Sequence, residues 1–129
     1  MQRAPYHRFD VRFDPEQLQA DLRRVAPEEW EPHYNTRDHD GPWDGVALRA
    51  VAGSRTPLFV DTSADARIAD TALLARCPAF RAVLDWFDTP LRSVRLLRLG
   101  AGASVREHCD PQLGVDDGEV RLHVPVATN

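Results

Sequence analysis

Two stretches in the last third of the chain alternate in side-chain character, and this pattern constrains the fold most. Residues 93–99 have two alternating sets of positions, with Val94, Leu96 and, less regularly, Arg98 on one side and Arg95, Leu97 and Leu99 on the other. Residues 119–126 place Leu122, Val124 and Val126 on one side and Arg121, His123 and Pro125 on the other. Because successive side chains of a strand point to opposite faces, both stretches predict strands of a sheet with one buried face.

Earlier in the chain, two segments carry apolar residues at helical spacing. Residues 15–25 follow Asp14-Pro15, an N-cap residue and a proline at the first helical position. A second helix is predicted after Cys77-Pro78 and stops before Thr89-Pro90. Alternation also predicts strands at 8–13 and 43–51, whereas 52–70 reads as loop with a short extended piece at 58–60. Together these elements predict a single α+β domain over residues 1–129, with helices packed on an antiparallel sheet.

Composition limits the classes of function that the chain could serve. With 129 residues, 43% apolar and 28% charged, the chain is long enough for one globular domain with its own core. Its net charge is -4 and its basic residues are scattered among acidic ones, which argues against a nucleic-acid partner. The apolar runs are too short to cross a bilayer, and the N-terminus lacks the apolar core of a signal peptide. Two cysteines, Cys77 and Cys109, are not at zinc-finger spacing, so we expect a cytoplasmic protein, with one disulfide left open.

His108 and Asp110 are separated by one residue. On an extended segment such positions share a side, with Cα atoms about 7 Å apart. An imidazole with a carboxylate is typical of ferrous sites built on two histidines and one carboxylate, which leave three coordination positions open. The spacing predicts His108 and Asp110 as metal ligands, although the same pattern also occurs in solvated loops.

Arg121 and His123 stand on the polar side of the last predicted strand. A guanidinium group that faces the interior needs an anion. If residues 111–118 form a hairpin connection, both side chains lie near the predicted metal ligands. The pattern therefore predicts an anion site beside the metal; the alternatives are a surface arginine and a core histidine with structural hydrogen bonds.

These motifs together resemble the aspartyl/asparaginyl β-hydroxylase family. The residues that carry the resemblance are Val94-Arg95-Leu96-Leu97-Arg98-Leu99, Gly102-Ala103, His108-Cys109-Asp110 and Arg121-Leu122-His123-Val124-Pro125-Val126-Ala127-Thr128-Asn129. Weaker upstream matches are Trp30, His33-Tyr34, Trp43 and Gly45-Val46-Ala47-Leu48, so that the resemblance spans about residues 28 to 129.

Members of this family are Fe(II)- and 2-oxoglutarate-dependent dioxygenases with a double-stranded β-helix, the jelly-roll or cupin-like core. The resemblance implies that His108 and Asp110 bind iron, and that Arg121 and His123 contribute to the 2-oxoglutarate pocket. It also implies O2 as a substrate, together with an amino acid or an Asp/Asn-type side chain, free or within a peptide.

The sequence departs from the family after its last motif. Family members continue with a further histidine ligand and an arginine that binds the far carboxylate of 2-oxoglutarate, and the resemblance thus implies an incomplete domain whose last strands are missing. Unpaired sheet edges would then favour self-association. Two other interpretations stay open: a non-catalytic remnant that serves as an interaction module, and a cupin-like metal site with His123 as third ligand. His33 and His39 are expected to be solvated, or to rim a substrate mouth, rather than to bind metal.

Overall fold

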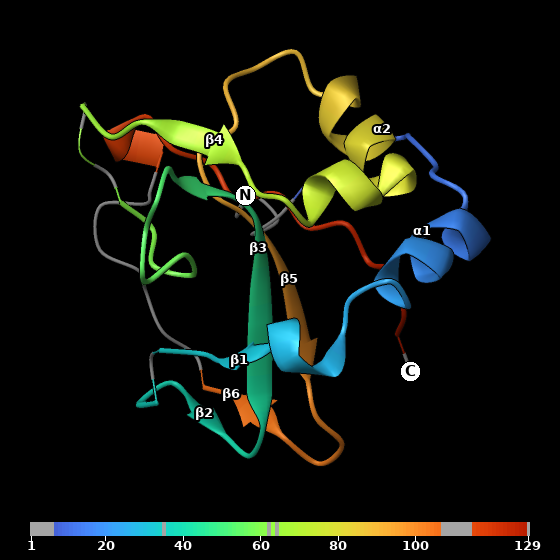
Figure 1. The fold of residues 1–129 in the computed structure, drawn as a ribbon, viewed down its shortest axis with the longest axis vertical. Helices are drawn as coiled ribbons and strands as arrows, with labels where there is room; N and C mark the ends of the chain where they lie inside the picture. Colours follow the sequence, from blue (N-terminus) through green and yellow to red (C-terminus); the bar gives the residue numbers. More distant parts are fainter. Residues whose placement is uncertain (1–6, 35, 62, 64, 107–114, 129) are drawn as a thin grey trace, which may run out of the picture.

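The computed structural model describes residues 7–34, 36–61, 63, 65–106 and 115–128. Its centre is an antiparallel sheet around the long strand β3 (Trp43–Val51). One edge of β3 pairs with β5 (Val94–Leu99), and the other pairs with the short strands β1 (Glu31–Pro32) and β4 (Ile68–Asp70). A second, two-stranded sheet pairs β2 (His39–Asp40) with β6 (Ser104–Val105). Figure 1 shows β3 and β5 running side by side through the middle of the molecule.

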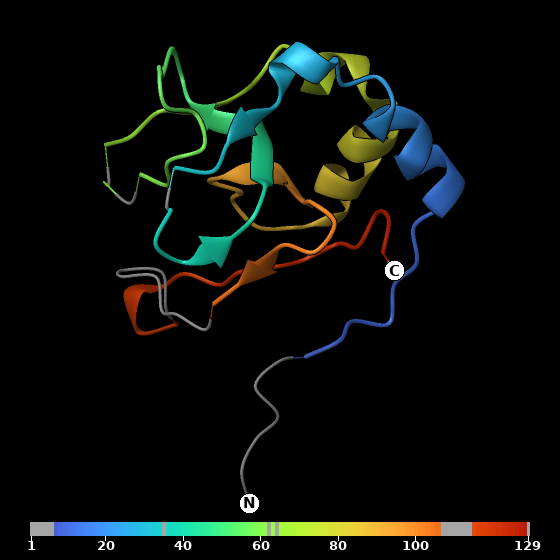
Figure 2. The ribbon, with the colours of Figure 1, turned by 90° about the horizontal axis from the view of Figure 1, so that it is seen from below.

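Two α-helices, α1 (Pro15–Leu22) and α2 (Pro78–Trp86), lie together beside this sheet (Figures 1 and 2). Three short 3-10 helices complete the described elements: η1 (Pro27–Glu29), η2 (Leu74–Arg76) and η3 (Val115–Asp117). Mixed helices and antiparallel strands confirm the predicted α+β class. No helix in the described ranges is both long and apolar enough to cross a membrane.

The core lies between the helices and one face of the β3–β5 pair. α1 contributes Leu18, α2 contributes Phe80, Val83 and Leu84, and the strands contribute Val46, Leu48 and Leu96. Val46 and Leu96 are directly opposite each other in the strand register, so they share this face. The apolar periodicities of the two helices and the two strands therefore meet in one cluster. This confirms the two predicted helices, the first of which ends at Leu22 rather than at residue 25, and the strands predicted at 43–51 and 93–99.

The opposite face of the sheet is covered by the loop between β3 and β4. Leu58, which is 3% exposed, packs there over Gly45. A Cβ atom at Gly45 would lie 3.0 Å from side-chain carbons of both Leu58 and Leu97, so the glycine makes room for this contact. The predicted extended piece at 58–60 forms turns rather than a strand. Arg95, opposite Ala47 in the register, lies on this loop-covered face.

A buried carboxylate joins the two helices. Asp21 in α1 is 2% exposed, and its Oδ2 accepts hydrogen bonds from the backbone N–H groups of Ala79 (2.6 Å) and Phe80 (3.1 Å). These groups belong to the first turn of α2, whose N–H groups have no partners within the helix. Asp21 thus caps a helix 57 or more residues away in sequence, and Cys77, fully buried beside it, is a free thiol.

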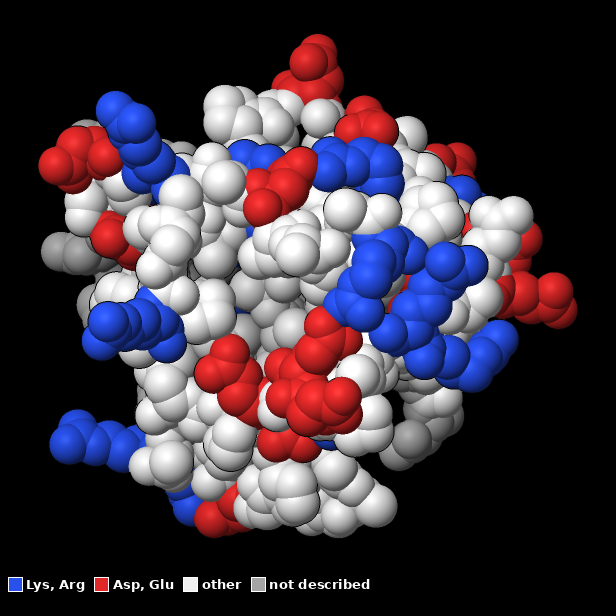
Figure 3. Space-filling view, viewed as in Figure 1, with Lys and Arg blue, Asp and Glu red and all other residues white. Residues whose placement is uncertain are grey.

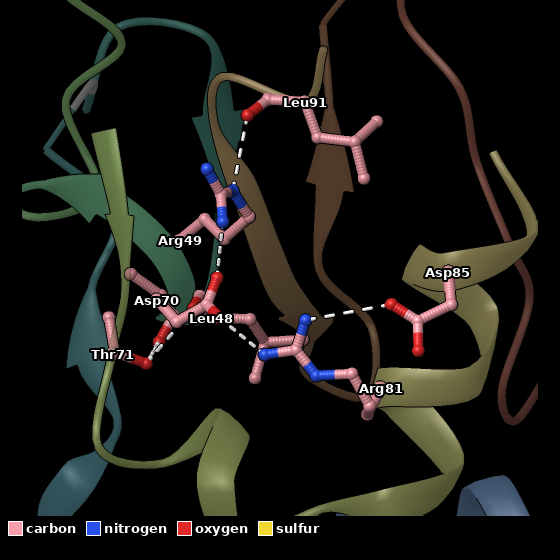
Figure 4. Close-up of polar contacts among 8 residues, drawn as sticks. Leu48, Arg49, Asp70, Thr71, Arg81, Asp85 and Leu91 are labelled. Carbon is pink, nitrogen blue, oxygen red and sulfur yellow. Dashed lines mark hydrogen bonds and ion pairs between the residues drawn. The ribbon is translucent and has the colours of Figure 1, made fainter. Parts of the chain in front are cut away.

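An exposed polar network ties β3 and β4 to α2 (Figure 4). Asp70 forms ion pairs with Arg49 and Arg81, and Arg81 also approaches Asp85 at 3.7 Å. Arg49 Nε donates to the carbonyl oxygen of Leu91 at 3.1 Å. Together these contacts connect the short strand β4 to the helix and to the segment before β5.

The structure differs from the sequence-based expectation at both ends of the chain. Residues 8–13 form no strand; Phe13 instead packs against the core and meets Trp86 edge to face, with ring centroids 6.2 Å apart. Residues 119–126 were also predicted as a strand, and they too pair with no strand in the described structure. In that segment Val124 and Val126 pack against the core, and Gln19 Nε2 donates to the Val126 carbonyl at 3.0 Å. Alternation at both places reflects packing against the helices rather than pairing in a sheet.

Candidate functional site

The predicted iron ligands lie outside the described residues. His108 and Asp110, with Cys109 between them, fall in the stretch 107–114. The described chain reaches this stretch through β6 and Arg106 and resumes at η3. The assignment of His108 and Asp110 as ligands therefore stays a prediction.

The other two predicted site residues line a cavity. Arg121 and His123 belong to the lining of a hollow of about 330 Å³, between the C-terminal segment 118–126 and the β5–α2 side of the core. β5 contributes Arg95 and Leu97, and α2 contributes Phe80, Val83 and Leu84. A volume of this order is typical of small-molecule sites. The predicted anion-binding pair thus faces a space large enough for a small ligand.

Positive charge gathers at this cavity. Partial burial lowers the pKa of His123 below its ordinary 6.5, and the nearby guanidinium groups of Arg121 and Arg95 lower this pKa further. His123 as a whole remains exposed, so its ring is only partly removed from water. Because the pKa of His123 is below 6.5, its imidazole is mostly neutral at pH 7. A neutral imidazole can both donate and accept a hydrogen bond. Two guanidinium groups beside a neutral imidazole form a surface suited to a carboxylate.

Arg95 is a member of this cluster that the sequence analysis did not select. Its Nη1 donates to the carbonyl oxygen of Leu58 at 3.1 Å, which holds the side chain against the loop over the sheet. The available signal was a cation on an otherwise apolar alternating segment, and Arg98 gives the same signal on the opposite side. That signal did not distinguish Arg95 from Arg98. Arg98 lies outside the cavity lining, stacks over Trp30 and pairs with Asp44 at 3.0 Å.

The upstream histidines belong to a separate aromatic cluster. His33 is 6% exposed and stacks on Trp43, with ring centroids 3.8 Å apart and planes 5° apart. Tyr34 stacks on the other side, and His39 meets Trp43 edge to face at 5.1 Å. The expectation that His33 is solvated is therefore wrong, because its ring is sandwiched between aromatic side chains. Neither histidine lines the large cavity.

Within the part of the chain that the structure describes, no three His, Cys, Asp or Glu side chains are grouped so as to hold a metal ion. The alternative set of His108, Asp110 and His123 has one described member, so it also stays a prediction.

On the face shown in Figure 3, basic and acidic side chains gather in adjacent groups rather than in one continuous basic surface.

Comparisons with known proteins give no relative: no family model, curated protein or solved structure matches this chain. Only the residues themselves and the geometry of the cavity therefore bear on function.

Proposed function

We propose that this chain is part of an Fe(II)- and 2-oxoglutarate-dependent dioxygenase domain with a double-stranded β-helix core. Its reaction would hydroxylate an amino acid or an Asp/Asn-type side chain. The observation that carries the proposal is the convergence of Arg121, His123 and Arg95 on one cavity of about 330 Å³.

The lining fits the cosubstrate chemically. 2-Oxoglutarate is a small dianion with a carboxylate at each end, and a guanidinium group binds a carboxylate through two parallel hydrogen bonds. The chain contains no lysine, so every basic side chain near the cavity is an arginine with this planar donor geometry. A neutral His123 adds a hydrogen-bond donor without needing a counter-ion of its own.

His108 and Asp110 would hold the metal in this proposal. Bound iron, with the oxoacid and O2, supplies the oxidising power that replaces a C–H bond by C–OH. The protein's own residues bind and orient the reactants: Arg121 and Arg95 hold carboxylate charge, and His123 directs a hydrogen bond. Apolar side chains of α2 and β5 form much of the remaining wall and limit the access of water.

The test uses the purified chain under nitrogen with Fe(II). Binding of 2-oxoglutarate is measured by calorimetry, and its conversion to succinate is measured after O2 is admitted. We expect Arg95→Gln to weaken 2-oxoglutarate binding about tenfold, a loss of about 1.4 kcal/mol. Arg98→Gln, a change in the same strand outside the cavity, should leave the affinity unchanged.

The metal is tested separately with His108→Ala. This variant should lose succinate formation and Fe(II) binding while its unfolding transition stays that of the wild type. Oxoacid binding that depends on Arg95 but never leads to succinate would instead support the non-catalytic alternative, a carboxylate-binding module. Equal affinity in the Arg95 and Arg98 variants would remove the basis of the proposal.

A further inference from the structure

Two hydrogen-bond donors beside the cavity are buried without a partner. Among the described residues, neither Arg92 Nε nor Ser93 Oγ has a hydrogen-bond partner, although both atoms are inaccessible to solvent. Both residues belong to the cavity lining, just before β5 begins at Val94. A buried donor without a partner costs about 1–3 kcal/mol, so two such donors on consecutive residues favour a bound group that pairs with them.

The Arg92 side chain is held in position by its other end. Its Nη2 donates to the carbonyl oxygens of Asp61 (3.2 Å) and Ser63 (2.7 Å) in the loop over the sheet. The Asp61 carboxylate, which also lines the cavity, accepts hydrogen bonds from the backbone and hydroxyl of Ser63. These contacts fix the guanidinium plane and leave the Nε–H edge for another partner. The anchored end leaves little side-chain freedom to be lost on binding, and the lining must open before a ligand can reach the two buried donors.

The surroundings of these donors define the rest of the ligand. Phe80, Val83, Leu84 and Phe87 line the cavity from the α2 side, and Leu91 lines it next to Arg92. A guanidinium N–H and a hydroxyl can donate together to the two oxygens of one carboxylate. The apolar wall beside them suits a hydrocarbon body rather than a second charge.

We propose that Arg92 and Ser93 form a carboxylate-binding subsite for a small acid with an apolar body. This subsite is distinct from the Arg95, Arg121 and His123 cluster and does not depend on the proposed oxygenase reaction. It assigns to the cavity a second ligand class, an apolar monocarboxylate, beside the dianionic oxoacid.

Octanoate is the probe, and octan-1-ol, with the same chain and no carboxylate, is the control ligand. Calorimetry and the ligand-induced shift in melting temperature are measured without metal. We expect Ser93→Ala and Arg92→Gln each to weaken octanoate binding about fivefold or more, as expected for loss of one donor to a charged group. Ser104→Ala, an exposed serine outside the cavity, should bind octanoate as the wild type does.

The two subsites should respond independently. Ser93→Ala should leave 2-oxoglutarate binding unchanged, and Arg121→Gln should weaken octanoate binding far less than it weakens 2-oxoglutarate binding. Without ligand, Ser93→Ala should melt at the wild-type temperature or above, because it removes a buried hydroxyl that lacks a partner. This last result distinguishes a ligand-binding donor from a structural one.

Three outcomes would overturn the subsite. Octan-1-ol could bind as tightly as octanoate, which would mean that the carboxylate is not recognised. Octanoate affinity could be unchanged in Ser93→Ala and Arg92→Gln. Finally, Ser93→Ala could melt well below the wild type, which would show that the hydroxyl already serves the fold, for instance through a bound water.

Discussion

The helix side and the C-terminal side of the core differ in whether their buried polar groups have hydrogen-bond partners. Where α1 meets α2, the buried carboxylate of Asp21 receives two backbone hydrogen bonds. Around the cavity, Arg92 Nε and Ser93 Oγ are buried without described partners, and burial together with nearby cations lowers the pKa of His123. The first arrangement stabilises the fold, whereas the second has an electrostatic cost that a ligand would offset. Such costs are typical of binding sites, where function and stability compete.

The largest effect should follow from breaking the helix side. Asp21→Ala removes the acceptor for two N–H groups at the start of α2 and leaves them buried. We expect a loss of about 3 kcal/mol in the free energy of unfolding, measured by urea denaturation. Asp21→Asn keeps one acceptor oxygen but loses the charge at the helix N-terminus, and should cost about 1 kcal/mol.

Asp85→Ala is the matched control, because Asp85 also lies in the helix pair but is exposed and forms only a 3.7 Å pair with Arg81. It should change the free energy of unfolding by less than about 0.5 kcal/mol. If Asp21→Ala and Asp85→Ala were equally mild, the buried cap would not hold the helices together.

On the cavity side, a charge removed from the site should change binding and not stability. Arg121→Gln should weaken 2-oxoglutarate binding about tenfold, because a carboxylate loses a charge-assisted pair of hydrogen bonds. The urea midpoint should stay within experimental error or rise, since the cationic cluster becomes less repulsive. Calorimetry and urea denaturation on the same sample give both quantities.

Arg23→Gln provides the comparison, since Arg23 is exposed at the end of α1 and outside the cavity lining. Its oxoacid affinity should equal that of the wild type. A fall in stability of Arg121→Gln as large as that of Asp21→Asn would mean that Arg121 supports the fold, and the contrast between the two sides would no longer hold.

Periodicity predicted the helix side of the fold well. The apolar spacing of α1, α2, β3 and β5 indicates the side that each element buries, and these four elements supply most of the core. The strands β1, β2, β4 and β6 are only two or three residues long, too short to show a period. They are formed by pairing partners distant in sequence. The alternation at 8–13 and 119–126 did not lead to pairing, and it indicated burial only in part: Phe13, Val124 and Val126 pack against the core, whereas Phe9 and Leu122 are exposed.

The candidate site was less accessible to sequence reasoning. Arg121 and His123 were predicted as site residues because they are polar residues on an alternating segment, and a guanidinium group that faces the interior needs an anion. Arg95 and Asp21 were missed, because their roles depend on contacts with Leu58 and with the first turn of α2. Such contacts leave no trace in local spacing.

A smaller effect is expected from the exposed ion pairs of Asp70 with Arg49 and Arg81. The hydrogen bond from Arg81 lowers the pKa of Asp70 most; burial opposes this shift, and the hydrogen bond from Arg49 lowers the pKa further. Its stabilising contribution is therefore present above about pH 3.9 and is lost as the pH falls through the lower folded pKa. Because the pairs are exposed, Asp70→Asn should cost no more than about 1 kcal/mol at pH 7.

The same substitution should flatten the acid limb of the stability curve, as followed by urea denaturation between pH 2 and about pH 5. Added salt should reduce the difference between wild type and variant, since exposed charges are screened. Asp65→Asn serves as a control in the β3–β4 loop, outside this network. An acid limb that is identical in wild type and Asp70→Asn would show that the network does not contribute to the fold.

The smallest effect should come from His123. Here the folded state disfavours the charged form of the side chain, whereas it favours the charged form of Asp70. Burial, then Arg121 and Arg95, lower the folded pKa of His123 below 6.5, so the unfolded state binds a proton more readily. The fold is therefore unaffected by this group above about pH 6.5 and loses stability as the pH falls from there to the folded pKa. His123→Gln should remove this loss, so that the variant gains stability relative to the wild type on going from pH 7.5 to pH 5. His7→Gln, an exposed histidine near the N-terminus, should show no such gain.

Bound 2-oxoglutarate should offset the neighbouring positive charge, raise the pKa of His123 and reduce the gain in stability of His123→Gln. If the gain were the same with and without the oxoacid, His123 and the ligand would not share one cavity.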